Sequence, residues 1–304
     1  MSNSFNNRVY GCAIIKSINS NYNADFSHQP RTLPNGVVYA TDKALKWAIR
    51  NYWKQVVKEK VFYSKSLDES MSPRTLDETF ENYFGEEIFK LKDKNQIRIE
   101  VLKNILSCID VRLFGGTYAG KTNISIHGSC QISHGVNRFG QNVIYSEQIM
   151  SPFRNSGESS TESTMTTLGS QSRLAEGHYV HHFSVNPKNI ESDVVRVNAT
   201  GLSEDDIFKL KEGLRKGVSY YDSAAKIGTD NECLIWVQLK PESKAILPSF
   251  VELVTINDKR ELDLTGVKDV VAKHASDIEK VEVFFDLSNT KVINLPESAV
   301  KLEL

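Results

Sequence analysis

The feature that most constrains the fold is a stretch near the start of the chain, residues 8–53. Its first part, residues 8–17, is apolar and rich in β-forming side chains, which predicts an interior strand. An Asn-rich loop over residues 19–25 and a Pro-Arg turn follow. A helix then begins at Thr41 or Asp42, either of which can cap it, and its apolar residues recur at helical spacing. A strand that leads through a polar loop into a cationic helix is suited to holding a phosphate backbone.

The composition is that of an ordinary globular protein, with 40% hydrophobic and 25% charged residues in a chain of 304. A net charge of −1 excludes a general polyanion binder, but the charge is uneven. Residues 1–60 carry nine Lys/Arg against three Asp/Glu, whereas residues 261–304 carry five against nine. This asymmetry permits a local anion site and a head-to-tail contact between copies, although a solvated surface would have the same pattern.

The four cysteines lie far apart in apolar surroundings and form no CxxC pair. We therefore expect buried thiols in a reducing compartment, and neither a metal site nor a cofactor. No apolar run approaches the roughly 18 residues that a membrane span needs, and the N-terminus has no signal pattern. The expectation is a cytoplasmic protein that does not bind a membrane.

The rest of the chain alternates between helical and strand patterns. Residues 61–94 are Ser-rich and acidic and predict an insertion on the main sheet, and the polar residues 155–167 predict a mobile loop or a projecting hairpin tip. Further helices are predicted over residues 76–92, 96–108 and 203–216, and strands over residues 123–135, 178–185, 233–240 and 280–286. This order suits an α+β fold with helices on one face of an antiparallel sheet.

One face of the helix that begins near residue 41 is cationic. On a helical projection five basic residues fall within an arc of roughly 120°, and Trp47 lies in the same arc. The five are Lys43, Lys46, Arg50, Lys54 and Lys58. Charges suit phosphates and an aromatic ring suits base stacking, so the pattern favours nucleic-acid binding. A solvated helix face with a packed Trp would produce the same pattern.

A second candidate is the segment of residues 110–116, Asp-Val-Arg-Leu-Phe-Gly-Gly, which ends a helix in a glycine turn. Adjacent glycines let backbone N–H groups approach a phosphate. The segment lacks the Lys-Ser/Thr ending of a Walker motif and the GxGxxG spacing, which argues against a nucleoside-triphosphate site. A structural turn explains it equally well.

The histidines give no specific support for catalysis. His127 and His134 would face opposite sides of a regular strand, unless a bulge at Gly128 changes the alternation. The sequence contains no HExxH motif and no paired carboxylates that suggest acid–base chemistry. We therefore expect a protein that is not an enzyme.

Five segments, taken in order, carry a resemblance to a known family. They are Asn7-Arg8 with Asn19-Ser20-Asn21, Asp25 and Pro30-Arg31; the helix Thr41–Tyr52; Asp110–Thr117; Gly128–Gly135; and Gly201–Asp206, continuing to Ser223 and Lys226. In this order they resemble the repeating backbone subunit of the type I CRISPR interference complex, Cascade. This is the seventh Cas protein family, and the likeness is to its type I-B branch.

The resemblance implies an RRM/ferredoxin-like palm with a helical finger insertion and a β-hairpin thumb. The palm would comprise residues 1–60, 96–138 and 177–304, the finger residues 61–95 and the thumb residues 139–176. Copies would stack along the spacer of a guide RNA (crRNA) into a helical filament, each thumb crossing the RNA. Base pairing between guide and target DNA would read the sequence, while the protein holds backbone and shape.

The resemblance also implies a set of RNA contacts. Lys43, Lys46, Arg50 and Arg112 would pair with phosphates, with Trp47 beside them; Asn19, Asn21 and Arg31 would orient the sugar-phosphate chain. Gly115 and Gly116, next to Phe114, would allow close backbone approach. Gln131, His134, Asn137 and Arg138 would lie at the base of the thumb, and Met165 and Thr166 near its tip would wedge between bases. Arg173 and Lys226 complete the set.

The implied partners are guide RNA, target DNA through the guide, further copies of the chain, and the cap, large and small subunits of Cascade. Two alternatives stay open. One is a metal-independent endoribonuclease that processes guide RNA on the same fold, with His127 or His134 as general base. The other is a structural protein that polymerises without nucleic acid.

Overall fold

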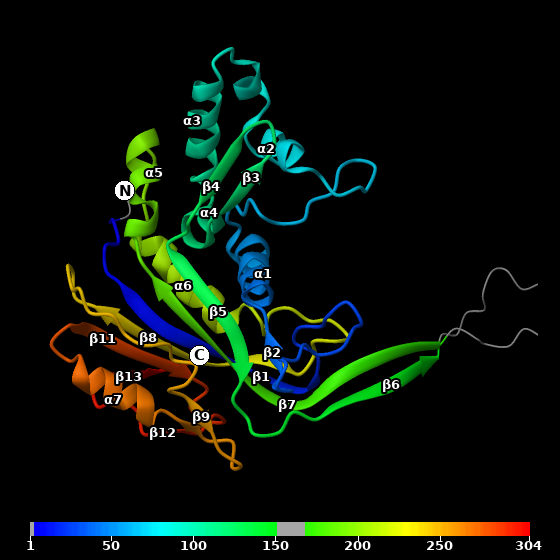
Figure 1. The fold of residues 1–304 in the computed structure, drawn as a ribbon, viewed down its shortest axis with the longest axis vertical. Helices are drawn as coiled ribbons and strands as arrows, with labels where there is room; N and C mark the ends of the chain where they lie inside the picture. The colour runs from blue at the N-terminus through cyan, green and yellow to red at the C-terminus, as the bar shows by residue number, and fades with distance from the viewer. Residues whose placement is uncertain (1–2, 151–167) are drawn as a thin grey trace, which may run out of the picture.

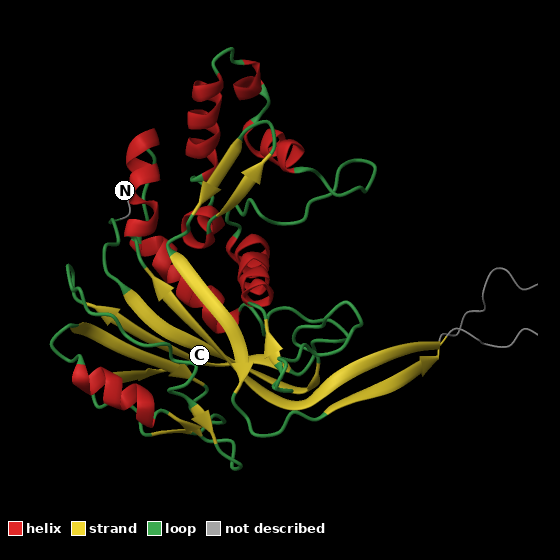
Figure 2. Cartoon of the chain, in the orientation of Figure 1, coloured by secondary structure: helices red, strands yellow, loops and turns green. Residues whose placement is uncertain are grey.

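The computed structural model describes residues 3–150 and 168–304. The two residues expected to wedge between bases, Met165 and Thr166, lie outside these ranges. The described chain folds around one large sheet with helices on both sides and a long hairpin that projects from it (Figures 1 and 2). No helix in the described ranges is long and apolar enough to cross a membrane.

The main sheet has eight strands. Seven follow the order β13 (Ala299–Leu302), β11 (Ile278–Phe285), β8 (Thr229–Leu239), β1 (Val9–Ser20), β7 (Leu168–Val185), β5 (Cys130–Asn137) and β2 (Tyr39–Ala40), and β6 (Ile144–Met150) pairs with β7 alone. Every pair is antiparallel except β11–β13. The α+β class with an antiparallel sheet is confirmed.

The central strand β1 is buried on both faces, as its unbroken apolar run predicts. Ala13 and Ile15 face a core that includes α1 (Asp42–Tyr52) and α6 (Glu204–Lys216). Cys12 and Ile14 face a second core, shared with α7 (Thr265–Lys273). A small sheet of β9 (Thr255–Ile256), β10 (Leu262–Asp263) and β12 (Val292–Ile293) lies on this second side. We expected helices on only one face of the sheet, but helices lie on both faces. Because β1 is apolar on both faces, other elements must bury each of them.

Four strands and two helices form the framework of the sheet. In chain order they are β1, α1, β5, β7, α6 and β8, and in space the strands lie in the order β8, β1, β7, β5. This βαββαβ order is that of a ferredoxin-like unit. Ser203 caps α6 and forms a capping box with Asp206, at the start of the helix predicted over residues 203–216.

A large insertion separates α1 from β5. It contains α2 (Leu76–Phe84), a 3-10 helix η2 (Glu87–Lys90), α3 (Lys94–Ile105), α4 (Ile109–Phe114) and the two-stranded sheet of β3 (Gly116–Ala119) and β4 (Asn123–Ile126). The helix α3 packs against η2, β4 and α5 (Lys188–Val197). The chain rejoins the main sheet only at Cys130, so much of the expected second palm segment, residues 96–138, lies beside the expected finger (Figure 1).

The strand predicted over residues 123–135, with an interruption at Gly128, is wrong as one element. It is two strands in two different sheets, β4 and β5. Between them Gly128 approaches the backbone of Gly115 so closely that a Cβ on Gly128 would lie 2.2 Å from the Gly115 nitrogen. This contact joins Gly128 to the glycine turn at Gly115. An alternation of neighbouring residues contains no signal for a contact between separate segments.

The long hairpin consists of β6 and the first half of β7. It falls within residues 139–176, the expected thumb, and most of the β6 side chains are exposed. The strand β7 runs without a break from the hairpin into the sheet, ten residues longer at its start than the predicted strand over 178–185. The four cysteines are buried and free, as expected.

Candidate nucleic-acid interface

The first turns of α1 supply one exposed cation and one exposed aromatic side chain. Thr41 caps the helix by accepting a hydrogen bond from the backbone N–H of Ala44. The side chain of Lys43 is 81% exposed and its Nζ lies 3.1 Å from Asp42 Oδ1. Trp47 is 45% exposed, and its ring meets Tyr221 edge-on with 4.5 Å between centroids. Lys43 and Trp47 are therefore accessible to a ligand.

The next two cations of the predicted stripe are engaged inside the protein. Lys46 is only 12% exposed, and its Nζ lies 3.3 Å from Asp42 Oδ2. Arg50 donates from Nε to Asp110 Oδ2 over 3.1 Å, and the Asp110 carboxylate, which is fully buried, also accepts the backbone N–H groups of Phe62 and Tyr63. Arg50 is thus the counter-ion of a buried carboxylate.

The stripe also ends earlier than the helical projection implies. After Tyr52 the chain forms a π-helix over Trp53–Val57, and Lys58 adopts a left-handed conformation with φ of 62°. The projection assumed α-helical geometry as far as Lys58. Lys58 therefore does not extend the line of cations on α1.

Arg112, expected to contact phosphate, instead holds a buried acid. Its Nε and Nη2 donate to the two carboxylate oxygens of Asp206 over 3.1 and 2.5 Å, and its Nη1 donates to the carbonyl of Leu106. Asp206 is the residue that completes the capping box of α6. The guanidinium of Arg112 thus joins α4 to the start of α6.

The glycine turn after α4 serves packing. Phe114 is buried and stacks on Trp53 at 5.3 Å. Gly115 has φ of 66°, and a Cβ there would lie 2.2 Å from the Ile126 carbonyl oxygen; a Cβ on Gly116 would lie 2.3 Å from the ring of Tyr63. Both glycines therefore allow a close approach of protein atoms, and the expected contact of a phosphate with this turn stays a prediction.

The Asn-rich loop and the base of the hairpin are tied together. Arg173 on β7 donates from Nη1 to the Asn19 carbonyl over 2.8 Å, and the Tyr145 hydroxyl on β6 donates to Asn19 Oδ1 over 3.1 Å. Asn21 is buried and donates from Nδ2 to the carbonyls of Ser172 and His28. Two of the segments expected to contact RNA, the Asn-rich loop and the start of β7, therefore lie together.

Two further basic residues stabilise the same loop. Arg31 donates from Nε to the Ala24 carbonyl over 3.1 Å. Lys226 donates to the carbonyl of Tyr22 and lies over the Tyr22 ring, and burial lowers the pKa of its ammonium group. Both side chains hold the loop in shape, and Arg31 is still partly exposed.

Four residues on and after β5 were expected to contact RNA, and they differ in how far they are buried. Asn137 is buried, and its Oδ1 accepts the backbone N–H groups of Phe139 and His178. Arg138 pairs with Glu252 over 3.2 Å. Gln131 and His134 are exposed. Nδ1 of His134 faces the backbone N–H of Asp42 at 3.4 Å, so β5 and the start of α1 meet at this residue.

A groove beside α1 contains residues that the sequence reasoning missed. Its cavity of about 120 Å³ is lined by Trp47, Arg50, Asn51, Lys54, Gln55, Tyr63, Ser64 and Lys65. Lys54 crosses it to donate to the Ser64 hydroxyl over 3.0 Å. The segment 63–65 comes from the Ser-rich insertion, which we predicted only as a separate element. Tyr63 and Lys65 are the one sequence signal from which this groove could have been predicted.

Comparisons with known proteins agree with this architecture. The model of the family described as CRISPR-associated protein Cas7 matches residues 7–283. A chain of a solved structure titled "CRISPR RNA-guided surveillance complex, pre-nicking" is similar in fold, with a TM-score of 0.60 and 13% identity over 98% of this chain and 96% of that one. A chain titled "CRISPR RNA-guided surveillance complex" has a TM-score of 0.51 and 13% identity over 95% of both chains. A search of curated proteins found no match.

The sheet with its projecting hairpin is therefore similar in fold to a chain of a CRISPR RNA-guided surveillance complex. Because the family model spans most of its length, the chain belongs to the Cas7 family.

Proposed function

We propose that the chain is a guide-RNA-binding subunit that multimerises along the crRNA spacer and forms the helical backbone of a type I Cascade complex for antiviral DNA targeting. The family match over residues 7–283 carries this proposal. The partners are the guide RNA, target DNA through the guide, further copies of the chain, and the cap, large and small Cascade subunits. The subtype is I-B, and the complex is cytoplasmic.

The geometry supports an RNA path between α1 and the base of the β6–β7 hairpin. Lys43 and Trp47 are exposed on α1, Lys65 is exposed beside the groove, and His134 is exposed where β5 meets α1. Charged groups pair with phosphates irrespective of sequence, and an exposed ring accepts any base. Such a surface suits a subunit that leaves sequence reading to the guide.

The subunit acts without catalysis. His181 is fully buried, where desolvation lowers its pKa to about 4, and Cys108 and Cys130 are buried thiols whose pKa burial raises to about 12. These groups are unsuited to attack a phosphodiester. Nδ1 of His134 lies 3.4 Å from the backbone N–H of Asp42 and 3.6 Å from the Asp42 carboxylate. When Nδ1 accepts that N–H, the neutral ring carries its proton on Nε2, which then cannot act as a base.

Purification with guide RNA tests the proposal. The chain is co-expressed with a CRISPR array transcript, and the bound RNA is extracted and sequenced. We expect spacer-containing guide RNA and, by electron microscopy, a helical row of identical subunits. Protein that forms the same row without RNA would contradict the proposal and favour the structural polymer.

The ribonuclease alternative is tested separately with labelled guide precursor. We expect wild-type protein to bind the precursor and leave it intact. Specific cleavage that is lost in either His127→Ala or His134→Ala, with RNA binding retained, would overturn the non-catalytic assignment.

A further inference from the structure

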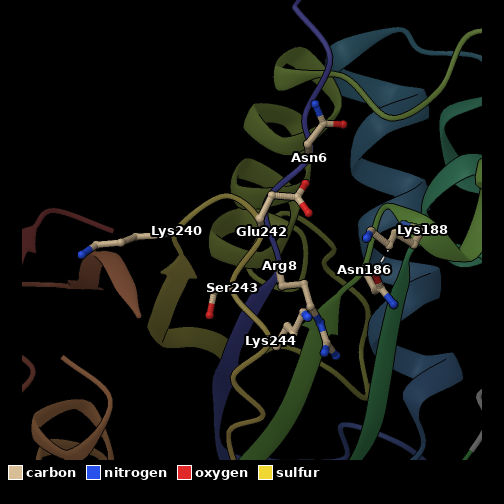
Figure 3. A pocket seen from close by; sticks show the side chains of 8 residues that line it. All are labelled: Asn6, Arg8, Asn186, Lys188, Lys240, Glu242, Ser243 and Lys244. Atoms are coloured by element: carbon tan, nitrogen blue, oxygen red, sulfur yellow. Dashed lines mark hydrogen bonds between the residues drawn. The ribbon is translucent and has the colours of Figure 1, made fainter. Parts of the chain in front are cut away.

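A basic pocket lies at the end of the sheet where β1 begins and β7 and β8 end. Val9 at the start of β1 pairs with Val185 on β7 and Gln238 on β8. Because both pairings are antiparallel, the residues just outside these strands converge. The cavity of about 270 Å³ is lined by Asn6, Arg8, Asn186, Lys188, Lys240, Glu242, Ser243 and Lys244 (Figure 3).

The basic side chains of this pocket outnumber its carboxylates. Four basic side chains share it with one carboxylate, that of Glu242. In the described parts of the chain none of Arg8, Lys188, Lys240 and Lys244 takes part in an ion pair, whereas Lys209 and Lys211 on nearby α6 both do. Figure 3 shows Arg8 and Lys244 side by side, with Lys188 and Asn186 across from them and Lys240 turned away. An excess of like charge in a concavity attracts an anion.

Arg8 is the innermost of these cations. Its guanidinium carbon lies 5.1 Å from the centroid of the Tyr10 ring, so one face is covered by an aromatic surface. Its Nε is buried, and no group in residues 3–150 and 168–304 accepts a hydrogen bond from it. A buried donor without an acceptor is costly, because it has lost its water. The Arg8 side chain as a whole is half-buried, so an anion in the pocket would meet its accessible atoms and not the buried Nε.

We propose that this pocket binds a phosphate group of single-stranded DNA that is not paired with the guide. The proposal rests on the proposed function, which places the chain in a complex that opens a DNA duplex. A guanidinium fork with flanking ammonium groups suits a phosphate, and the neutral donors Asn186 and Ser243 suit the sugar-phosphate chain. The pocket lies at the opposite end of β1 from the Asn-rich loop. The strand β1 has 12 residues, so Arg8 lies roughly 35 Å from Asn19.

The test uses the guide-loaded complex and a fluorescein-labelled single-stranded DNA without complementarity to the guide. Affinity is measured by anisotropy over a series of KCl concentrations for wild type and for Lys188→Glu/Lys244→Glu. We expect at least about a tenfold loss of affinity, and a salt slope that falls by about 0.7 because the one phosphate contact of the pocket is lost. The matched control is Lys273→Glu/Lys301→Glu, two exposed lysines outside the pocket, which should bind as wild type does.

A second measurement keeps the pocket testable without any guide. The Tm of the wild-type protein should rise in inorganic phosphate relative to chloride at equal ionic strength, and that of Arg8→Gln should not. Equal DNA affinity in wild type and double variant would overturn the proposal. The proposal would also be overturned if poly-glutamate of equal charge displaced the labelled DNA as strongly as unlabelled DNA does. Guide RNA content is measured in parallel. Loss of guide from the wild-type complex contradicts the proposed function, whereas an unchanged Tm with guide retained contradicts only the pocket.

Discussion

At the scale of single residues, Arg112 separates a structural role from a role in RNA binding. Its guanidinium makes two hydrogen bonds to the buried Asp206 carboxylate. Removal of one partner leaves the other charge buried and unpaired, so Arg112→Ala should lower the free energy of unfolding by about 3–5 kcal/mol. Urea denaturation of the RNA-free protein measures it. The exposed Lys43→Ala serves as control and should change stability by less than about 0.5 kcal/mol. If both variants are equally stable, Arg112 has no structural role and is again assigned to RNA binding.

His181 makes stability depend on pH in a defined window. The ring is buried against Ser133 and Tyr22, and desolvation lowers its pKa from the ordinary 6.5 to about 4. Below pH 6.5 the unfolded chain binds a proton that the folded chain accepts only near pH 4, so stability should fall as the pH decreases between these values. In His181→Gln this part of the slope should disappear.

The control for that measurement is Ile15→Val, which removes one buried methylene and no titratable group. It should lower the free energy of unfolding by about 1 kcal/mol at every pH. Denaturant titrations from pH 7 to pH 4 compare the three proteins. The same slope in wild type and His181→Gln would show that other groups cause the pH dependence.

At the scale of elements, α1 and the segment beside it carry the exposed charge expected to hold RNA. Lys46 and Arg50 pair with carboxylates, so their reversal would test folding as much as binding. We therefore reverse Lys43, Lys54 and Lys65 together to Glu. The salt slope for single-stranded RNA should fall by about 2, since each lost phosphate contact removes about 0.7. Filter binding measures it, with Lys273→Glu/Lys301→Glu as control, and an unchanged slope would place the RNA elsewhere.

Local patterns predicted those elements whose signals are themselves local. The apolar run of β1, the start of α1 at Thr41 or Asp42 and the start of α6 near residue 203 were all predicted from neighbouring residues. The partners of the basic side chains were not, because Arg50 meets Asp110 and Arg112 meets Asp206 across distant parts of the chain. A helical projection identifies a cationic face, but it contains no information about which carboxylate packs against it.

At the scale of the whole molecule, the proposed function makes the size of the assembly depend on the guide. If each copy covers a fixed length of spacer, a longer spacer should add whole subunits. The mass of the complex, measured by native mass spectrometry over a series of spacer lengths, should rise in steps of one 34.3 kDa chain plus the added RNA.

Two controls decide how that series is interpreted. Protein purified without a CRISPR transcript should not form the ladder, because the RNA sets the number of copies. The Lys43→Glu/Lys54→Glu/Lys65→Glu variant should retain the fold of the monomer and add fewer copies at each spacer length, because weaker phosphate contacts reduce occupancy. A ladder whose number of copies is the same for every spacer length would mean that contacts between subunits, and not the guide, fix the length of the row.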